Sequence, residues 1–323
     1  IRDSPLLINI VDNDLITHAQ SDGDDIVFTD REGTKFAHEI ESFNSSTGNL
    51  VAWVNVPSLS SSIDTILLMY YGQPLCTSQQ NPTAVWDIGF HLVEHLDEAS
   101  GTHYDSTIFG NHGVCSGDMD QNGVGVIDGA DDFDGVDDYI NYGDPATLEF
   151  TTELTLEAWV NHSTVSAYQN IIAKWHDTAG RSYSLTMFPT RYLNFYVSNN
   201  ANHVKVNTTK TITANTWHYV VGTFANGQLK IYLDGSLSNQ TMSSFTSLYD
   251  ASTTDFTIGH AQLWGAMTNT YMDGLLDELR VSNIARSAEW IATCYSNQQS
   301  PSTFYQCGAE EVGARQDEPF IIS

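Results

Sequence analysis

The chain has 323 residues, which is enough to bury more than one hydrophobic core, and its charge is strongly negative. Lysine and arginine total 12 against 40 acidic residues, giving a formal net charge of −28 at pH 7. Because contacts to phosphate need a basic surface, this balance excludes a nucleic-acid-binding protein. It also disfavours anionic membranes and strongly acidic polysaccharides, and no apolar run is long enough to span a bilayer.

Residues 1–80 are expected to form a small β-domain made of short strands. The apolar extended runs are Leu6–Val11, Ile26–Thr29, Leu50–Val56 and Ile63–Tyr71. Turn-forming pairs such as Asp-Gly and Glu-Gly flank the second run, as is typical of connections between strands. The polar stretch Pro74–Pro82, bounded by prolines, has the composition of a linker to a second domain.

From Ala84 onward the expected strands are longer and more aromatic. They are Leu154–Val160, Tyr183–Met187, Tyr192–Val197, Trp217–Phe224, Leu229–Leu233 and Asp255–Ile258. A single helix is expected at Ser287–Tyr295, with Ser287 as its N-cap. Many strands at turn spacing with almost no helix predict an antiparallel β-sandwich over residues 84–311. Residues 312–323 are left as a C-terminal tail.

Carboxylates are concentrated in two places that point to a cation. The turn-rich stretch Ile127–Tyr142 is crowded with aspartates, which repel one another unless they are solvated or share an ion such as calcium. In Asp273–Val281, a two-residue period places Asp277 on the same face as Leu275 and Leu279. Asp277 is therefore expected to point inward, and an unpaired buried carboxylate is costly. We predict that a cation or a set of hydrogen bonds compensates its charge.

The four cysteines are Cys76, Cys115, Cys294 and Cys307, and none has the CxxC spacing of a metal site. Two disulfide bonds in an oxidising compartment are the better interpretation. Three pairings are open, of which Cys294–Cys307 and Cys76–Cys115 bring together the cysteines that are closest in sequence. Each loop of this size would stabilise the fold by about 3 kcal/mol.

Four sequons for N-linked glycosylation point to the same compartment. They occur at Asn44, Asn161, Asn207 and Asn239, each followed by Ser or Thr two positions later. Such sequons arise by chance in chains rich in Asn, Ser and Thr, but together with the cysteines they predict an extracellular or cell-surface protein.

Several motifs in a fixed order carry a resemblance to a known family. Residues 86–311 resemble the laminin-G-like jelly rolls of the concanavalin A-like lectin/glucanase superfamily. The motifs are HLDEASGTHYDST (95–107), FDGVDDYI (133–140), LTLEAWV (154–160), NTWHYVVGTF (215–224), LKIYLDG (229–235) and MDGLLDELRV (272–281). The first 80 residues resemble a small extracellular β-domain of uncharacterised function, through DGDDIVFTDREGT (22–34), EIESFNSSTGNLVAWVNVPSL (39–59) and DTILLMYYG (64–72).

The resemblance implies a two-sheet jelly roll with a structural calcium ion away from the usual ligand face. Asp277 and the backbone carbonyl of Gly135 occupy positions matching ligands of that ion, and Asp97 is a third candidate. The superfamily also contains glycoside hydrolases, which need two carboxylates projecting toward the sugar from one strand. Their ExDxxE arrangement is absent, and Glu94 and Asp97 fall on opposite faces of a strand. A non-catalytic protein is expected.

Two kinds of partner remain open. Glycan binding, in an adhesion role, needs exposed aromatic side chains, and Trp175 and Trp264 lie in turn-rich contexts that favour exposure, although aromatics in a sandwich more often pack in the core. The alternative is a filament or surface layer built by strand addition between copies. In that hypothesis the apolar tail end Pro319–Ile322 pairs with an incomplete sheet of a neighbour, whereas a frayed tail is the simpler expectation.

Overall fold

The computed structural model describes residues 1–261, 270–308 and 317–322 and divides the chain into two compact units. The first unit contains residues 1–87 and the described residues from Thr293 onward, and the second contains residues 88–292. The predicted boundary near residue 80 lies close to the observed one. The predicted end of the second domain at residue 311 is wrong, because the chain after Ala292 returns to the first unit.

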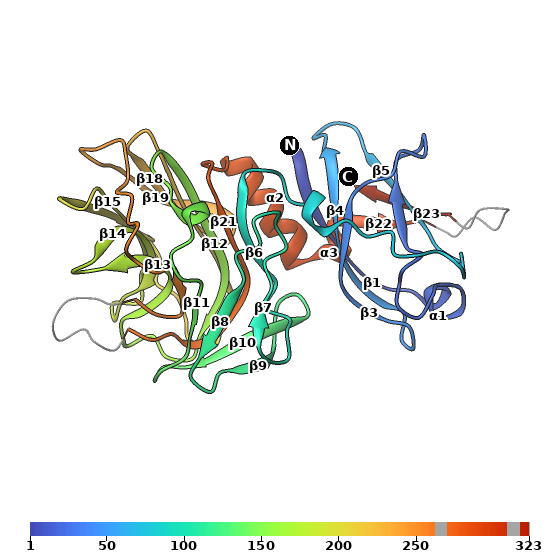
Figure 1. Cartoon of the computed structure of the whole chain (residues 1–323). Coiled ribbons are helices and arrows are strands. Elements are labelled where there is room, and N and C mark those ends of the chain that lie inside the picture. Colours follow the sequence, from blue (N-terminus) through green and yellow to red (C-terminus); the bar gives the residue numbers. More distant parts are fainter. Residues whose placement is uncertain (262–269, 309–316, 323) are drawn as a thin grey trace. The chain divides into compact units, whose positions relative to one another are not determined.

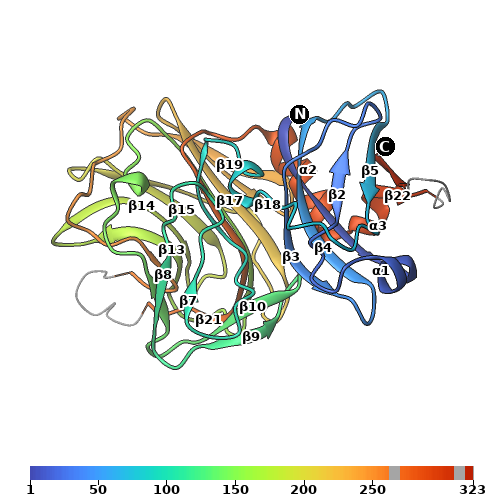
Figure 2. The ribbon, with the colours of Figure 1, turned by 45° about the vertical axis from the view of Figure 1, so that its right-hand side comes forward.

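The first unit contains two antiparallel sheets that contribute to one hydrophobic core. One sheet has the order β1-β4-β3, with β1 at Arg2–Val11, β4 at Asn49–Ser58 and β3 at His38–Asn44. The other, visible in Figure 2, has the order β2-β5-β23-β22, with β2 at Val27–Thr29, β5 at Thr65–Tyr70, β23 at Asp317–Ile322 and β22 at Tyr305–Cys307. The unit also has the short helices α1 (Asn13–His18) and α3 (Pro301–Phe304) and the 3₁₀ turn η1 (Pro82–Ala84). The four strands predicted in this region are confirmed.

The C-terminal tail forms a strand within its own chain. Strand β23 pairs antiparallel with β5 on one side, where Phe320 is opposite Leu67, and with β22 on the other, where Phe320 is opposite Cys307. The tail therefore completes a sheet of the first unit. In the filament hypothesis the same strand would instead pair with a sheet of a neighbouring copy.

The second unit is a sandwich of two eight-stranded antiparallel sheets (Figure 1). The β12 sheet has the order β19-β18-β17-β12-β21-β10-β9, and β6 also pairs with β21. Its strands are β6 (Phe90–Glu94), β9 (Asp120–Val124), β10 (Gly129–Asp134), β12 (Glu153–His162), β17 (His218–Ala225), β18 (Gln228–Leu233), β19 (Ser236–Met242) and β21 (Asp273–Ser282).

The β13 sheet has the order β16-β15-β14-β13-β20-β11-β8-β7. Its strands are β7 (Thr102–His103), β8 (Gly113–Ser116), β11 (Tyr139–Asn141), β13 (Gln169–His176), β14 (Gly180–Met187), β15 (Leu193–Ser198), β16 (His203–Asn207) and β20 (Thr257–Ile258). A 3₁₀ turn, η2 (Ala146–Leu148), precedes β12. The predicted all-β jelly-roll sandwich with a smaller N-terminal β-domain is confirmed.

Strict alternation along β12 and β14 builds the core between these sheets. Leu154 and Leu156 of β12 are fully buried and belong to the same cluster as Tyr183 and Leu185 of β14. Successive side chains on a strand point to opposite faces, so one face of each strand fills the core. Trp159 of β12 is buried as well.

Helix α2 (Ala288–Gln299) contains the boundary between the two units. The Ser287 hydroxyl accepts the backbone N–H of Trp290 at 3.2 Å, which confirms the predicted N-cap. The helix ends four residues beyond the predicted Tyr295. None of the described helices is long and apolar enough to cross a membrane.

The two predicted disulfide bonds are not formed. All four cysteines lie within the described residues, and none is joined to another. Cys76 belongs to the first unit, whereas Cys115 is on β8 of the second unit, where its thiol donates to the Gly101 carbonyl at 3.3 Å. Cys294 is buried in α2 and Cys307 is exposed on β22. Closeness in sequence was a poor guide because each cysteine is held by a different element.

Candidate functional site

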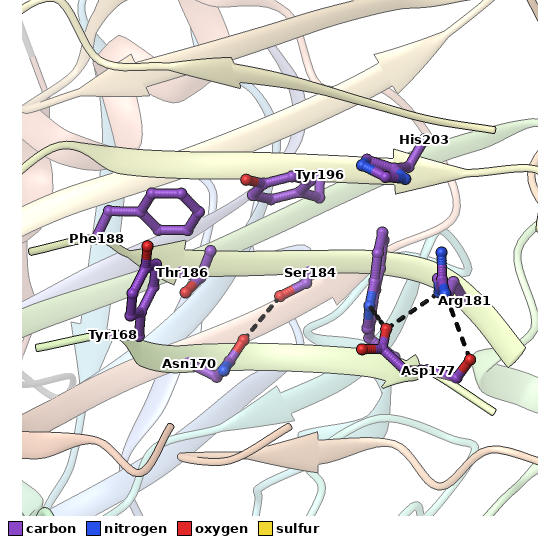
Figure 3. Close-up of a pocket in the computed structure, with 10 residues that line it drawn as sticks. Tyr168, Asn170, Asp177, Arg181, Ser184, Thr186, Phe188, Tyr196 and His203 are labelled. Atoms are coloured by element: carbon purple, nitrogen blue, oxygen red, sulfur yellow. Dashed lines mark hydrogen bonds and ion pairs between the residues drawn. The ribbon is translucent and has the colours of Figure 1, made fainter. Parts of the chain in front are cut away.

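The face of the β13 sheet turned away from the core carries a cavity of about 360 Å³ (Figure 3). Strands β13, β14 and β15 form its floor. In the figure, Tyr168 and Phe188 lie at one end, and Asp177 and Arg181 lie at the other. This cavity lies entirely within the second unit.

Two irregularities in the pairing of β13 with β14 determine which side chains face the cavity. The register shifts between Asn170 and Ile172, so Ile171 and Ile172 are both buried in the core. A β-bulge of this kind inserts one residue and reverses the alternation beyond it. As a result Asn170 and Trp175, five positions apart, both line the cavity. A second shift follows between Lys174 and Trp175.

Aromatic rings form the walls of the cavity. Tyr168 meets Phe188 edge to face at 4.7 Å between ring centroids, and Phe188 lies 5.9 Å from Tyr196. Tyr196 in turn meets Trp175 at 5.8 Å and 69°. The ammonium of Lys205 sits 4.4 Å from the centre of the Phe188 ring, a cation–π distance. Each of these rings is held by its neighbours, so the walls are preformed.

Small polar side chains make up the floor. The Ser184 hydroxyl donates to Asn170 Oδ1 at 3.1 Å, and the Thr186 hydroxyl donates to the Gln169 carbonyl at 2.7 Å. Asn170 is only 1% exposed, yet its Nδ2 has no hydrogen-bond partner among the described residues. Leaving a buried donor unmet costs about 1–3 kcal/mol, so this amide is poised to donate to a group that enters the cavity.

The charged end of the cavity is internally neutralised. Asp177 Oδ1 lies 3.1 Å from Arg181 Nε and accepts the indole N–H of Trp175 at 3.2 Å. Among the described residues that line the cavity, Asp177 is the only carboxylate. Glycoside hydrolysis requires two carboxyl groups about 5–10 Å apart, so the lining does not supply that chemistry.

A second cavity of about 370 Å³ lies beside the first and shares Trp175 with it. His260 stacks on Tyr271 in its wall, with ring centroids 4.3 Å apart and 15° between the planes. Asn141 Nδ2 donates to Asp255 Oδ2 at 3.1 Å in the same cavity. Trp175 therefore stands between two neighbouring hollows on one face of the sheet.

Ligand binding by Trp175 and Trp264 stays a prediction, and the expected exposure of Trp175 is not observed. Trp175 lines both cavities, but it belongs to β13 and is 7% exposed, so it is a wall and not an exposed platform on a loop. Trp264 lies outside the described residues. Asn170, Tyr196 and Phe188 also line the cavity and were not predicted from the sequence. One available signal was the alternation in β14, where Ser184 and Thr186 interrupt the core residues Tyr183, Leu185 and Met187.

Asp277 is buried as predicted, but on the other face of the strand. Leu276, Leu279 and Val281 enter the core, because a bulge opposite β12 shifts the register between Glu157 and Trp159. Asp277 Oδ2 accepts the backbone N–H groups of Val126 and Ile127 at 2.7 and 2.9 Å. The predicted inward orientation among aliphatic side chains is therefore wrong, since the bulge reverses the alternation.

One carboxylate oxygen of Asp277 is left without a partner. Its Oδ1 is buried with no hydrogen-bond partner in the described part of the chain. Burial, and next the charge of Glu278, raise the pKa of Asp277 well above its ordinary value. Glu278 itself is paired with His95 Nδ1 at 2.7 Å and with Arg280. An orphaned carboxylate oxygen fits a hard cation such as calcium.

Of the other two predicted calcium ligands, Asp97 lies near the strand that pairs with Asp277, whereas Gly135 lies far from Asp277. Asp97 is exposed and lies against the turn that leads into β10, where a Cβ added to Gly129 would come within 2.8 Å of its Cα. The β10–β21 register pairs Asp134 with Asp273, which places Asp277 opposite Ala130. Gly135 is five residues further along, roughly 17 Å away at strand spacing, so it does not share a site with Asp277.

Three of the sequon asparagines, Asn44, Asn161 and Asn207, lie at or next to strand ends, and Asn239 lies in the middle of β19. Asn44 is exposed, and Asn161, Asn207 and Asn239 are half-buried. Asn207 Nδ2 donates to the Thr208 carbonyl at 2.9 Å, and Asn239 Nδ2 donates to the Asn207 carbonyl at 3.0 Å. Glycosylation at these positions stays a prediction, with Asn44 the most accessible acceptor.

Comparison with family models supports the assignment of the fold. Residues 134–292 match the concanavalin A-like lectin/glucanases superfamily, and residues 22–112 match a domain of unknown function. The motifs thus predicted both matches correctly, with the concanavalin A-like match at residues 134–292 preceded by the other at residues 22–112. Comparison with curated proteins gives no match.

Several solved structures share the fold. Domain 4 of AbnA, a GH43 extracellular arabinanase from Geobacillus stearothermophilus solved with arabinotriose, is 17% identical, with a TM-score of 0.51 over 63% of this chain and 96% of that domain. The binding domain of Paraclostridial mosquitocidal protein 1 is 10% identical, with a TM-score of 0.53 over 64% of this chain and 52% of that one.

A structure of botulinum neurotoxin type C, whose cell entry depends on two ganglioside molecules, is 12% identical, with a TM-score of 0.51 over 65% of this chain and 52% of that one. The match thus spans about half of each toxin chain. At these identities the likeness shows a shared fold.

Proposed function

We propose that the second unit is a non-catalytic, carbohydrate-binding jelly roll that holds a neutral glycan in the cavity on the outer face of the β13 sheet. The observation that carries this proposal is the unmet, buried Nδ2 of Asn170 between aromatic walls. A sugar ring has apolar C–H faces and a rim of hydroxyls. Aromatic rings complement the faces, and a small number of placed polar groups fix the hydroxyls.

The charge of the protein narrows the ligand class. A protein with a net charge of −28 repels polyanionic ligands electrostatically. In the cavity itself, Asp177 is compensated by Arg181, so no free carboxylate awaits a cationic ligand. An uncharged oligosaccharide therefore fits better than a sulfated or polyacidic one. Domain 4 of AbnA, which shares the fold, was solved with arabinotriose, an uncharged oligosaccharide.

The wider biological role belongs to the same proposal. The protein acts outside the cell or at its surface in adhesion, and calcium held by Asp277 and Asp97 stabilises the jelly roll. The orphaned Oδ1 of Asp277 supports the metal, and the sequons support the location. The filament alternative requires β23 to leave its own sheet, and the intrachain pairing of that strand with β5 and β22 favours the glycan-binding role.

A glycan array probed with calcium-loaded protein tests the proposal. Neutral oligosaccharides should bind, and binding should weaken about 5- to 10-fold in Phe188→Ala and Tyr168→Ala, since losing an aromatic contact costs about 1 kcal/mol. Tyr104→Ala is the matched control, because Tyr104 is a 61% exposed aromatic that does not line the cavity. A uniformly negative array, or an equal loss in the control, would contradict the proposal.

A further inference from the structure

A second, enclosed group of polar side chains lies away from the glycan cavity, inside the second unit. Glu94 at the end of β6, His103 on β7 and Asp131 on β10 are each 0% exposed, and Glu98 is half-buried beside them. Glu94 and Asp131 come from the β12 sheet, whereas His103 is on the edge strand of the β13 sheet. The described ion pairs of Glu98 and Asp131 involve only His103.

The imidazole of His103 is held between two carboxylates. Its Nδ1 lies 2.9 Å from Glu98 Oε2, and its Nε2 lies 3.1 Å from Asp131 Oδ2. The backbone N–H of Tyr104 donates to the other oxygen of Glu98 at 2.8 Å and fixes that carboxylate. One ligand atom each from Glu94, Glu98 and His103 lies within 4.8 Å of the others.

Glu94 is the anomaly that points to a missing ligand. Both of its oxygens are buried without a hydrogen-bond partner in the described part of the molecule. The neighbouring Tyr142 hydroxyl lowers the pKa of Glu94 by hydrogen bonding, but it reaches neither carboxylate oxygen with the geometry of a full hydrogen bond. Buried carboxylates are almost always paired or bound to a metal, because desolvation of an unpaired charge costs several kcal/mol. Burial accordingly raises the pKa of Glu94 well above its ordinary value.

We propose that Glu94, Glu98 and His103 bind a divalent cation of the zinc class, with Asp131 beside the far nitrogen of the imidazole. An imidazole with two carboxylates suits zinc and its neighbours, whereas calcium prefers oxygen ligands alone. A histidine that ligates a metal usually donates its other N–H to a carboxylate. Asp131 Oδ2 lies 3.1 Å from His103 Nε2 without the geometry of a hydrogen bond, and Gln121 Nε2 lies 2.8 Å from the same nitrogen. Three protein ligands leave a fourth tetrahedral position open.

The spacing of the ligand atoms is compatible with one ion. Two atoms about 2.1 Å from a tetrahedral zinc lie roughly 3.4 Å apart. The observed separation of His103 Nδ1 and Glu98 Oε2 is 2.9 Å, so these two side chains need to move apart by only about 0.5 Å to admit the ion, and the Glu94 ligand atom lies within 4.8 Å of both. The ion would also join the two sheets, because Glu94 and His103 come from opposite layers.

The test uses the full chain, stripped with a chelator and titrated with zinc in buffer that contains excess calcium. Calorimetry and elemental analysis should give one zinc per chain and a raised unfolding temperature. Glu94→Gln should weaken zinc binding at least tenfold. Asp137→Asn is the matched control, because Asp137 belongs to an exposed group with Asp118 and Asp134 that could attract zinc nonspecifically. That variant should bind zinc like the wild type.

Three outcomes would overturn the proposal. They are the absence of zinc binding by the wild-type chain, unchanged binding by Glu94→Gln, and loss of binding in Asp137→Asn alone. Cobalt substitution gives a readout that does not depend on the folding of any variant. A visible spectrum of tetrahedral nitrogen and oxygen ligation supports the site, and the weak spectrum of an octahedral all-oxygen site counts against it.

Discussion

Replacing Asn170 by leucine is expected to weaken glycan binding without destabilising the free protein. The two side chains have the same branching at Cγ, and Asn170 lines the cavity on the outer face, so the core face of β13 is left intact. The substitution removes a buried donor that has no partner, which recovers about 1–3 kcal/mol, and it deprives the Ser184 hydroxyl of its acceptor, which costs about 1 kcal/mol. The unfolding free energy should therefore stay equal or rise by up to about 2 kcal/mol.

The same substitution removes the donor that the proposed ligand would use. A neutral hydrogen bond contributes about 0.5–1.5 kcal/mol, so the Kd for the array-selected glycan should rise about 2- to 13-fold by calorimetry. Asn297→Leu is the matched control, because Asn297 is 2% exposed and both its amide ends bond the Leu7 backbone, at 2.8 and 3.0 Å. The control should lose stability in urea and keep its affinity. If Asn170→Leu behaves like this control, the reasoning is refuted.

Three further predictions concern stability. Calcium should raise the unfolding temperature of the wild type but not of Asp277→Asn, and an equal rise in both would remove Asp277 from the metal site. Burial lowers the pKa of His162 to about 4, so its contribution is present above pH 6.5 and is lost as pH falls toward 4. The free energy of unfolding, measured in urea, should fall by about 2 kcal/mol between pH 7 and pH 5. His162→Gln should reduce this pH dependence, and an unchanged pH dependence in that variant would contradict the prediction. Deleting residues 317–323 should lower the unfolding midpoint of the first unit, because β5 and β22 lose the strand that pairs with both of them. The filament alternative would be favoured by an unchanged midpoint, or by the loss of an assembly that the intact chain forms.

Regular strands could be predicted from the sequence because their physics is local. In Leu154–Val160 every second residue is apolar, and the structure buries that set in the core. The N-cap at Ser287 was predictable for the same reason, since a hydroxyl before a helix satisfies a nearby backbone N–H. The return of the chain to the first unit after Ala292 was not, because pairing of β23 with β5 joins residues far apart in sequence.

The disulfide pairings show a similar limit. Counting cysteines gives a set of pairings but no geometry, and a bond requires the two Cα atoms to lie within about 7 Å of each other. Cys115 is positioned by β8 and Cys294 by α2, so the preference for neighbours in sequence had no structural basis. The prediction that Gly135 and Asp277 bind the same calcium ion was wrong for a similar reason. The strand register pairs Asp134 with Asp273, and the sequence does not reveal which residues of β10 and β21 lie opposite each other.

The candidate sites arise where alternation breaks down. Strict period two along β13 would place Asn170 on the face opposite Trp175, and strict period two along β21 would place Asp277 with Leu279 in the core. In both strands one inserted residue reverses the alternation of inward and outward side chains. In both, a polar side chain near the bulge has a buried atom without a hydrogen-bond partner, namely Nδ2 of Asn170 and Oδ1 of Asp277. Bulges are enriched next to functional sites because they re-aim a side chain while the ladder on either side remains paired. The regular strands thus carry the stability of this sandwich, and the bulged strands carry its unsatisfied groups, which is where ligands are expected to bind.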